Sequence, residues 1–250
     1  MLTNDTIVFV HFPRTGGTAF VHNCYNNLDF SPLHHNSNNR WMPGPGHNGV
    51  IDLVDSSFVP ESDKLKEVIT LIRNPWSWYY SLYEFQINSP RSSHEELNPV
   101  YEIAKNNTFD YWLRHILDEN NQLSYKTTGY FKDRWPTRTD WSDMYRLGIG
   151  SYTWYYISHF TTTYTTDVTD VNSVINADPG VSLTFFDMQT ELDQFIEFVK
   201  TTTSTTEFET QLRQNWVTPT EDYKTKYDSS LIDLVTQKDN DVITKHSFTF

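Results

Sequence analysis

The feature that most constrains the fold is a hydrophobic run near the start of the chain that leads into a glycine pair. Residues 6–12 (TIVFVHF) are β-branched and aromatic and end at Pro13, which predicts a short buried strand. Residues 13–17 (PRTGG) predict a tight loop, and residues 18–27 are compatible with a helix. A strand, a glycine loop and a helix in succession form a phosphate cradle, because a helix N-terminus attracts anions. The chain is therefore predicted to begin with an anion-binding βα unit.

The residues of this loop supply several groups that bind anions. Gly16 and Gly17 let backbone N–H groups approach a ligand closely. Thr15 and Thr18 add hydroxyl groups, and Arg14 adds a full positive charge. The spacing differs from GxxxxGK[ST], the loop of P-loop kinases, which argues against that class. Taken by itself, the loop suits a plain Gly-Gly turn equally well.

A second motif combines an arginine at a strand end with a serine on the following helix. Residues 67–73 (EVITLIR) predict a buried strand, and Asn74-Pro75 is a typical start for a helix over about 75–87. Arg73 and Ser81 can then converge on one anion, since a guanidinium binds a phosphate through two hydrogen bonds. The carboxyl ends of parallel strands meet at one sheet edge, which puts this motif near the loop. Two neighbouring anion sites suit a nucleotide with separated phosphate groups.

The second motif also has a structural interpretation. Arg73 would then bind strand carbonyl groups or a surface glutamate, and Ser81 would be a small residue tolerated in a buried helix. Ser81 alone favours this interpretation, whereas the two motifs together favour function.

The rest of the chain alternates predicted strands and helices with long polar loops. Residues 30–62 read as irregular, with a short element at 49–54. Further elements are a strand at 181–186 and helices at 108–119, 152–160, 188–200 and 228–243. The fold class predicted is α/β, with a P-loop-like central parallel sheet flanked by helices and long loop insertions. Residues 1–250 are predicted to form a single domain.

The charge and the residue usage exclude several classes of protein. The 32 acidic residues against 19 basic ones give a net charge of −13, which disfavours DNA, RNA or a polyanionic glycan as partner. Cys24 is the single cysteine, so no intrachain disulfide forms. No apolar run approaches the ~20 residues of a membrane span, and the N-terminus does not match a signal peptide. A cytoplasmic location without a membrane span is therefore expected.

The two motifs resemble those of sulfotransferases that use 3′-phosphoadenosine 5′-phosphosulfate (PAPS). HFPRTGGTAF is similar to that superfamily's 5′-phosphosulfate loop, and LIRNPWSWYYSLY to its 3′-phosphate motif. The closest pattern is that of Golgi-type and bacterial carbohydrate sulfotransferases. Their strand and following helix resemble VSLTFFDMQTELDQFIEFV, and their C-terminal region resembles YKTKYDSSLIDLVTQKDNDVITKHSFTF. The family's usual loop lysine is Arg14 here, which keeps the charge on a bulkier, forked group.

The resemblance implies a function and a role for each motif residue. Arg14 and the backbone of Thr15, Gly16, Gly17, Thr18 and Ala19 would hold the 5′-phosphosulfate, while Arg73 and Ser81 would hold the 3′-phosphate. The enzyme would transfer the sulfuryl group of PAPS to a hydroxyl acceptor and release 3′-phosphoadenosine 5′-phosphate (PAP). No metal is implied, because protein cations neutralise the charge.

The acceptor hydroxyl needs a general base to take its proton. His47, in the segment PGPGHNGVIDL, is the first candidate, because 2-O-sulfotransferases of uronic acids place a histidine in a similar Gly-His segment. An imidazole also titrates near neutral pH. Other candidates are His34, His35, Asp52 and Asp55.

The acceptor itself is predicted only as a class. The net charge of −13 favours a neutral or weakly charged hydroxyl compound, such as a saccharide or glycolipid. Residues 126–146 combine five basic residues with Trp135 and Trp141. The segment suits closure over the nucleotide or binding of an acidic or sugar acceptor, and it equally suits a solvated loop with aromatic anchors.

Two alternative functions remain at this point. A nucleotide or small-molecule kinase of the P-loop type would need a carboxylate that binds Mg²⁺ at a strand end, for which Asp187 is the candidate. A non-catalytic nucleotide-binding protein of the same fold would use the same motifs without chemistry, and the arginine in place of the family lysine is its support.

Overall fold

A computed structural model describes most of the chain and divides it into two compact units. The described residues are 2–17, 20, 31–32, 49–55, 62, 66–88, 99–118, 120, 142–203 and 222–250. Unit 1 comprises Met1–Arg73, His159–Thr162 and Ala177–Thr220, and unit 2 comprises Asn74–Ser158, Thr163–Asn176 and Glu221–Phe250. Each unit has its own architecture and is described by itself.

Unit 1 contains a mixed sheet whose centre is parallel. Strands β2 (Ile7–Val10), β4 (Glu67–Ile72) and β5 (Leu183–Asp187) lie side by side in parallel, with Val8 opposite Val68 and Val68 opposite Leu183. Two short strands, β1 (Leu2–Thr3) and β3 (Ser31–Pro32), extend the other side in antiparallel pairing, so the order is β3-β1-β2-β4-β5. The predicted α/β class and the three predicted strands are confirmed. The two short strands were not predicted, because two residues carry no periodicity.

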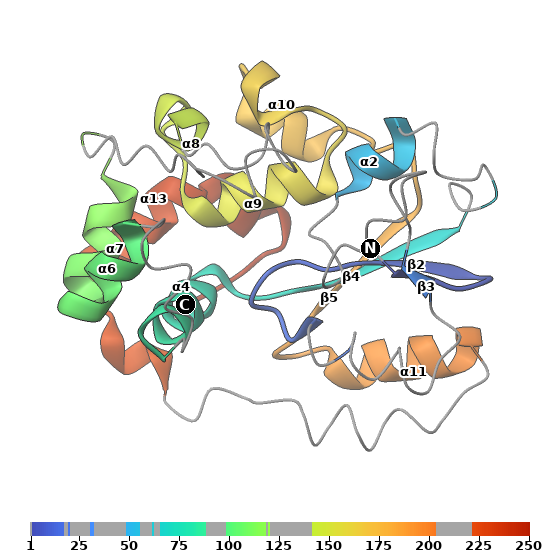
Figure 1. Cartoon of the computed structure of the whole chain (residues 1–250), viewed down its shortest axis with the longest axis horizontal. Coiled ribbons are helices and arrows are strands. Elements are labelled where there is room, and N and C mark those ends of the chain that lie inside the picture. The colour runs from blue at the N-terminus through green and yellow to red at the C-terminus, as the bar shows by residue number, and fades with distance from the viewer. Residues whose placement is uncertain are drawn as a thin grey trace. The chain divides into compact units, whose positions relative to one another are not determined.

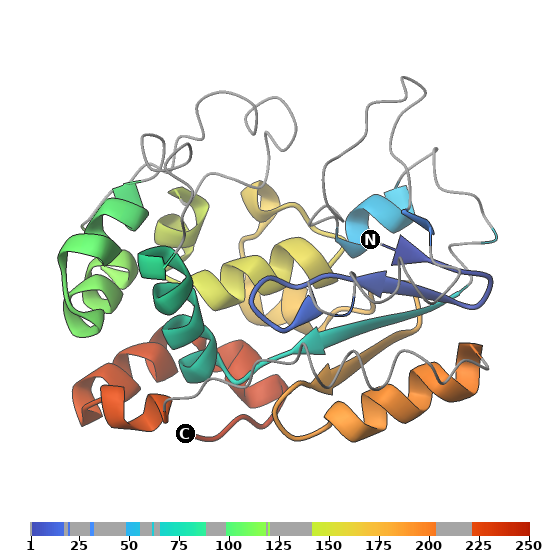
Figure 2. The same cartoon turned by 60° about the horizontal axis from the view of Figure 1, so that its bottom comes forward.

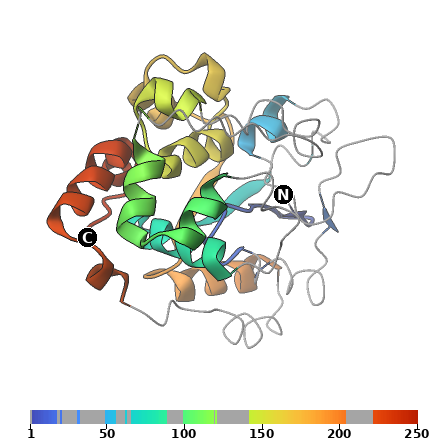
Figure 3. The same ribbon diagram turned by 60° about the vertical axis from the view of Figure 1, so that its left-hand side comes forward.

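Helices lie on both sides of this sheet (Figure 1). Helix α11 (Leu192–Thr203) and helix α2 (Val50–Asp55) are on opposite sides in all three views, as Figures 2 and 3 also show. Alternate strand residues such as Phe9 and Leu71 share a buried cluster with Phe195 of α11. Phe20 joins this cluster, with its ring 4.5 Å from that of Phe9 and 5.0 Å from that of Phe195. Each large apolar side chain buried here stabilises the unit by about 1.5–3 kcal/mol.

Helix α11 begins four residues later than the predicted helix 188–200, which was wrong at its start. The carboxylate of Asp187 accepts a hydrogen bond from the N–H of Gln189 at 2.8 Å, and the N–H of Glu191 donates to the carbonyl oxygen of Asp187 at 2.7 Å. In return, the N–H of Asp187 donates to Oε2 of Glu191 at 2.7 Å. This reciprocal bonding stabilises a turn, because Asp readily binds its own following backbone N–H groups.

Unit 2 is helical. It contains α4 (Pro75–Asn88), α6 (Pro99–Asn106), α7 (Phe109–Leu117), α8 (Ser142–Leu147), α10 (Val171–Asn176), α13 (Ser229–Lys245), the 3-10 helices η1 (Thr165–Asp167) and η2 (Tyr223–Lys226), and most of α9 (Ser151–Phe160). The helices predicted at 75–87, 108–119, 152–160 and 228–243 are confirmed. The short helices α6, α8 and α10 were not predicted.

The core of unit 2 is unusually aromatic. Trp78, Trp112, Trp154, Tyr79 and Tyr152 are all fully buried. The ring of Trp78 meets the rings of Tyr79 and Tyr152 edge-on, at 5.1 Å and 5.3 Å between centroids. Edge-to-face pairs of this kind add to the stabilisation from burial. The aromatic residues therefore compensate for the modest total of apolar residues in the sequence.

A buried carboxylate ties three elements of unit 2 together. Asp239 of α13 is 0% exposed and accepts hydrogen bonds from the hydroxyl of Tyr79 and the N–H of Thr153, both at 2.8 Å. The N–H of Gly150 donates to the carbonyl oxygen of Lys238 at 2.8 Å. A Cβ on Gly150 would lie 2.3 Å from Asp239 Oδ2, so only glycine fits at this close approach. Burial raises the pKa of Asp239 to about 6, against the lowering effect of these hydrogen bonds.

No helix within the described residues is long and apolar enough to cross a membrane.

Candidate anion-binding site

The carboxyl ends of β2, β4 and β5 bring the predicted loop residues and Arg73 to one edge of the sheet in unit 1. β2 ends at Val10 and continues into residues 11–17, β4 ends at Ile72 directly before Arg73, and β5 ends at Asp187. Thr70 Oγ1 donates to the carbonyl oxygen of Val10 at 2.8 Å, which joins β2 and β4 beside this edge. The carboxyl edge of a parallel sheet is where ligands bind in open α/β folds.

The backbone of the loop alternates in handedness. Arg14 and Gly16 have left-handed φ angles of 64° and 77°, whereas Thr15 and Gly17 are not in the left-handed region. Such alternation turns successive backbone N–H groups to one side and forms a concavity that binds anions. The N–H of Phe20 then donates to the carbonyl oxygen of Gly16 at 3.3 Å, which starts the predicted helix at the loop. The loop thus alternates in handedness, as anion-binding loops do, while its role as an anion site stays a prediction.

Arg14 is an exception among residues with side chains, because a left-handed conformation strains any residue other than glycine by roughly 1 kcal/mol. Only one other described non-glycine residue, Ser247, has a positive φ. A strained residue persists only where its surroundings fix it, and such residues gather at functional sites.

The hydroxyl of Thr15 stabilises the loop from within. Thr15 is 0% exposed, and its Oγ1 donates to the carbonyl oxygen of Phe12 at 2.8 Å. The hydroxyl was predicted as a donor to the ligand, but its proton is used inside the loop. If Thr15 binds an anion, the backbone N–H that the resemblance implies is the group left to do so.

Arg73 contacts the loop directly. Its guanidinium is almost completely buried, and Nη1 donates to the carbonyl oxygen of Arg14 at 3.3 Å. The structure thus brings together the two arginines that the sequence placed in separate motifs. The guanidinium binds a loop carbonyl, which differs from the strand carbonyl or surface glutamate of the structural interpretation.

Gly17 is required by packing as well as by the loop. A Cβ on Gly17 would lie 2.2 Å from Cδ2 and 2.8 Å from Nε2 of His11, so the imidazole fills the space beside this glycine. His11 is buried, and its ring is parallel to that of Phe9 at 6.5 Å. Sequence reasoning did not single out His11. Its position two residues after Phe9, on the same face of the strand, was the signal that could have found it.

Asp187 is engaged in its own turn. Burial raises the pKa of Asp187 above its ordinary value. Hydrogen bonds from the N–H of Gln189 and the side chain of Thr190, together with the nearby charge of Arg73, oppose this rise. These contacts weaken the kinase alternative, which assigned Asp187 to Mg²⁺. Among the described residues, no group of three or more His, Cys, Asp or Glu side chains is arranged to hold a metal ion.

Ser81 lies in unit 2, on the helix that the Asn74-Pro75 pair begins. It is 9% exposed. The side-chain oxygen of Asn74 accepts the N–H of Trp76 at 3.1 Å, and the N–H of Trp78 donates to the carbonyl oxygen of Asn74 at 2.9 Å, as expected of a capping residue. The predicted start of the helix is therefore confirmed, while the role of Ser81 stays a prediction.

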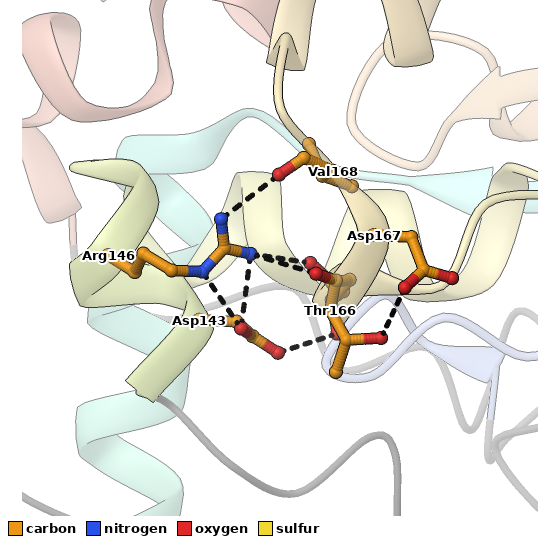
Figure 4. A network of polar contacts seen from close by, with 6 residues as sticks. Asp143, Arg146, Thr166, Asp167 and Val168 are labelled. Carbon is orange, nitrogen blue, oxygen red and sulfur yellow. Dashed lines mark hydrogen bonds and ion pairs between the residues drawn. The ribbon is translucent and has the colours of Figure 1, made fainter.

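Arg146, one of the five basic residues of segment 126–146, stabilises unit 2 (Figure 4). Its guanidinium binds the carboxylate of Asp143 at 3.1 Å and donates to the carbonyl oxygens of Thr165 at 3.0 Å, Thr166 at 3.4 Å and Val168 at 3.1 Å. One arginine thereby holds the 3-10 helix η1 against α8. These contacts favour the structural interpretation for this residue of the segment.

Several predicted residues lie outside the described part of the chain. They are Thr18, Ala19, Cys24, His34, His35, His47, the side chains of Asp52 and Asp55, and residues 126–141. The general base and the acceptor segment therefore remain predictions from the sequence.

Comparison with protein-family models, curated proteins and solved structures gave no match for this chain.

Proposed function

We propose that the chain is a PAPS-dependent sulfotransferase with a P-loop-like sheet and that its loop 13–17 holds the 5′-phosphosulfate. The observation that carries the proposal is the hydrogen bond from Arg73 Nη1 to the carbonyl oxygen of Arg14 at 3.3 Å. It joins a left-handed, glycine-containing loop to a buried arginine at the end of the neighbouring strand. Two cationic side chains and a row of backbone N–H groups at one sheet edge suit a nucleotide with two separate anionic groups.

The chemistry proposed is an in-line transfer. The acceptor hydroxyl oxygen attacks sulfur, the bond between sulfur and the bridging 5′-phosphate oxygen breaks, and PAP leaves. Arg14 offsets the negative charge that develops on the leaving oxygen, while the loop N–H groups fix the sulfuryl group in position. The acceptor's proton passes to a general base, for which His47 remains the sequence-based candidate.

The geometry favours transfer without a bound metal over the kinase alternative. The carboxylate of Asp187 accepts hydrogen bonds inside the turn that follows β5. The charge of the nucleotide would instead be neutralised by Arg14 and Arg73, which both belong to unit 1. The predicted acceptor remains a saccharide or glycolipid hydroxyl.

Calorimetry on the full chain tests this proposal. PAP, ATP and AMP are titrated with magnesium and with a chelator, and we expect PAP to bind at least ~10-fold more tightly than AMP in both conditions. Equal binding of ATP, or a requirement for magnesium, would reject the sulfotransferase assignment. Transfer of labelled sulfate from PAPS to a panel of glycans then tests catalysis. Tight PAP binding without transfer to any acceptor would support the non-catalytic alternative.

A further inference from the structure

Arg73 contacts the loop directly, although residues that bind two different phosphate groups of a nucleotide do not need to touch each other. The side chain leaves the end of β4, is 3% exposed, and reaches back to the carbonyl oxygen of Arg14 on the loop after β2. β2 and β4 are paired in parallel up to Val10 and Thr70. The contact therefore spans the two strand ends from which the two sequence motifs start.

The residue that receives this hydrogen bond is the strained one. Arg14 has a φ of 64°, a conformation that must be fixed by its surroundings. Two further contacts act on its neighbours: Thr15 Oγ1 donates to the carbonyl oxygen of Phe12, and the imidazole of His11 packs against Gly17. Of these three contacts, only that of Arg73 has a charged donor. It is also the contact that reaches the carbonyl of the left-handed residue itself.

We propose that Arg73 is a positioning residue for the 5′-phosphosulfate loop as well as a ligand of the 3′-phosphate, so that it couples the two halves of the nucleotide site. This inference rests on the proposed function for the identity of the ligand, but not for the shape of the loop. Removal of the guanidinium releases the carbonyl of Arg14. The loop then leaves its alternating conformation, and its N–H groups no longer converge on an anion.

A ligand that lacks the 3′-phosphate separates the two roles. Adenosine 5′-phosphosulfate carries the group that the loop holds and no 3′-phosphate. If Arg73 binds only the 3′-phosphate, its loss leaves the affinity for this ligand unchanged. If Arg73 also positions the loop, the affinity for both ligands falls.

The experiment measures binding of PAP and adenosine 5′-phosphosulfate to the wild type, Arg73→Ala and Arg73→Met. The Met variant keeps the length of the side chain in its buried position and removes all donors, so the test survives if the Ala variant fails to fold. We expect a loss of at least ~100-fold for PAP and at least ~10-fold for adenosine 5′-phosphosulfate, the range for a lost charge-assisted hydrogen bond. Unchanged affinity for adenosine 5′-phosphosulfate in a folded variant overturns the inference.

Amide hydrogen exchange without any nucleotide provides the second readout. We expect the N–H of Phe20, which donates to the carbonyl oxygen of Gly16 in the loop, to exchange at least ~10-fold faster in the Arg73 variants than in the wild type, and exchange at the wild-type rate would overturn the inference. If the wild type shows no preference for PAP, the proposed function fails while this readout still decides the role of Arg73. Arg114→Ala is the matched control, because Arg114 is an exposed arginine on α7 that pairs with Asp110 at 3.0 Å. It should change neither affinity nor exchange.

Discussion

Arg73 in unit 1 and Arg146 in unit 2 both donate to backbone carbonyl groups, but their surroundings differ. Arg146 is about half exposed, is neutralised by Asp143, and donates to three carbonyl oxygens of one short segment. Arg73 is almost fully buried and donates to the carbonyl of a strained loop residue at a sheet edge. The guanidinium of Arg146 is saturated within its own unit and serves stability, whereas that of Arg73 lies beside the loop for which we propose anion binding. Judged by burial alone, Arg73 would have been assigned the structural role and Arg146 the ligand-binding role.

Two carboxylates, Asp239 in unit 2 and Asp187 in unit 1, are by comparison both used within their own units. Asp239 is fully buried within unit 2, where it accepts hydrogen bonds from Tyr79 and Thr153 and lies against Gly150. Asp187 lies at the sheet edge of unit 1, but its turn uses the carboxylate. Closed polar networks of this kind specify a packing arrangement, because every buried polar group needs a partner.

The largest effect is expected from Arg14→Gly, which separates function from stability in unit 1. The change removes the positive charge but relieves the left-handed strain at φ 64°. We expect PAP affinity to fall by at least ~100-fold, while the free energy of unfolding stays within about 1 kcal/mol of the wild type. Calorimetry and urea unfolding measure the two quantities. A large loss of stability with intact binding would show that Arg14 resembles Arg146 rather than a ligand-binding residue.

The second effect is a pH dependence of stability that arises in unit 2. The pKa of Asp239 is raised to about 6 in the folded chain from its ordinary 3.8, because burial favours the protonated form. Asp239 therefore stabilises the fold below pH 4, and this contribution is lost as the pH rises through about 6. The expected loss is roughly 3 kcal/mol.

Asp239→Asn should abolish this dependence, so the difference in unfolding free energy between wild type and variant should change by that amount between pH 4 and pH 7. The two proteins must be compared at each pH, because His246 adds a pH dependence to both of them. Burial lowers the pKa of His246 from 6.5 to about 4, so this residue destabilises the fold as the pH falls from about 6.5 towards 4. Asp233→Asn, an exposed position on the same helix, serves as control. A constant difference across the range would mean that Asp239 is not a buried carboxylate.

A smaller effect is expected from Gly17→Ala, which tests the packing beneath the loop. The new Cβ would meet the imidazole of His11 at 2.2 Å, so the ring or the loop must shift. We expect a destabilisation of about 1–3 kcal/mol and weaker PAP binding. Gly180→Ala is a comparison in the same unit: Gly180 has open space around it, so its φ of 70° predicts only backbone strain of about 1 kcal/mol and unchanged PAP binding. The double change Gly17→Ala with His11→Ala should recover part of the binding, and strict additivity would argue against the contact.

The smallest effect is expected from Arg146→Ala. The variant loses the ion pair with Asp143 and the bonds to η1, but the guanidinium is 46% exposed and water replaces part of these contacts. We expect a loss of about 1 kcal/mol in the free energy of unfolding and unchanged PAP affinity. Weaker PAP binding in a folded variant would return Arg146 to the acceptor or nucleotide site.

Local patterns in the sequence were sufficient for most elements of the fold. β2, β4 and β5 were predicted because each is a continuous apolar run, as strands buried on both faces are. Helices α4 and α13 were predicted from a capping residue and from apolar periodicity. The strands β1 and β3, with two residues each, depend on pairing with β2 and with one another and carry no local signal.

The candidate site divides in the same way. The sequence by itself determined that Arg14, the two glycines and Arg73 follow strands, and therefore that they belong at one sheet edge. Only the tertiary structure decided that Arg73 holds the carbonyl of Arg14, that His11 fills the space beside Gly17, and that the carboxylate of Asp187 is used by its own turn. Periodicity and the position of a residue directly after a strand are properties of neighbouring residues, so they can be read along the chain. A hydrogen bond between residues 59 positions apart depends on the pairing of β2 with β4, which only the folded sheet provides.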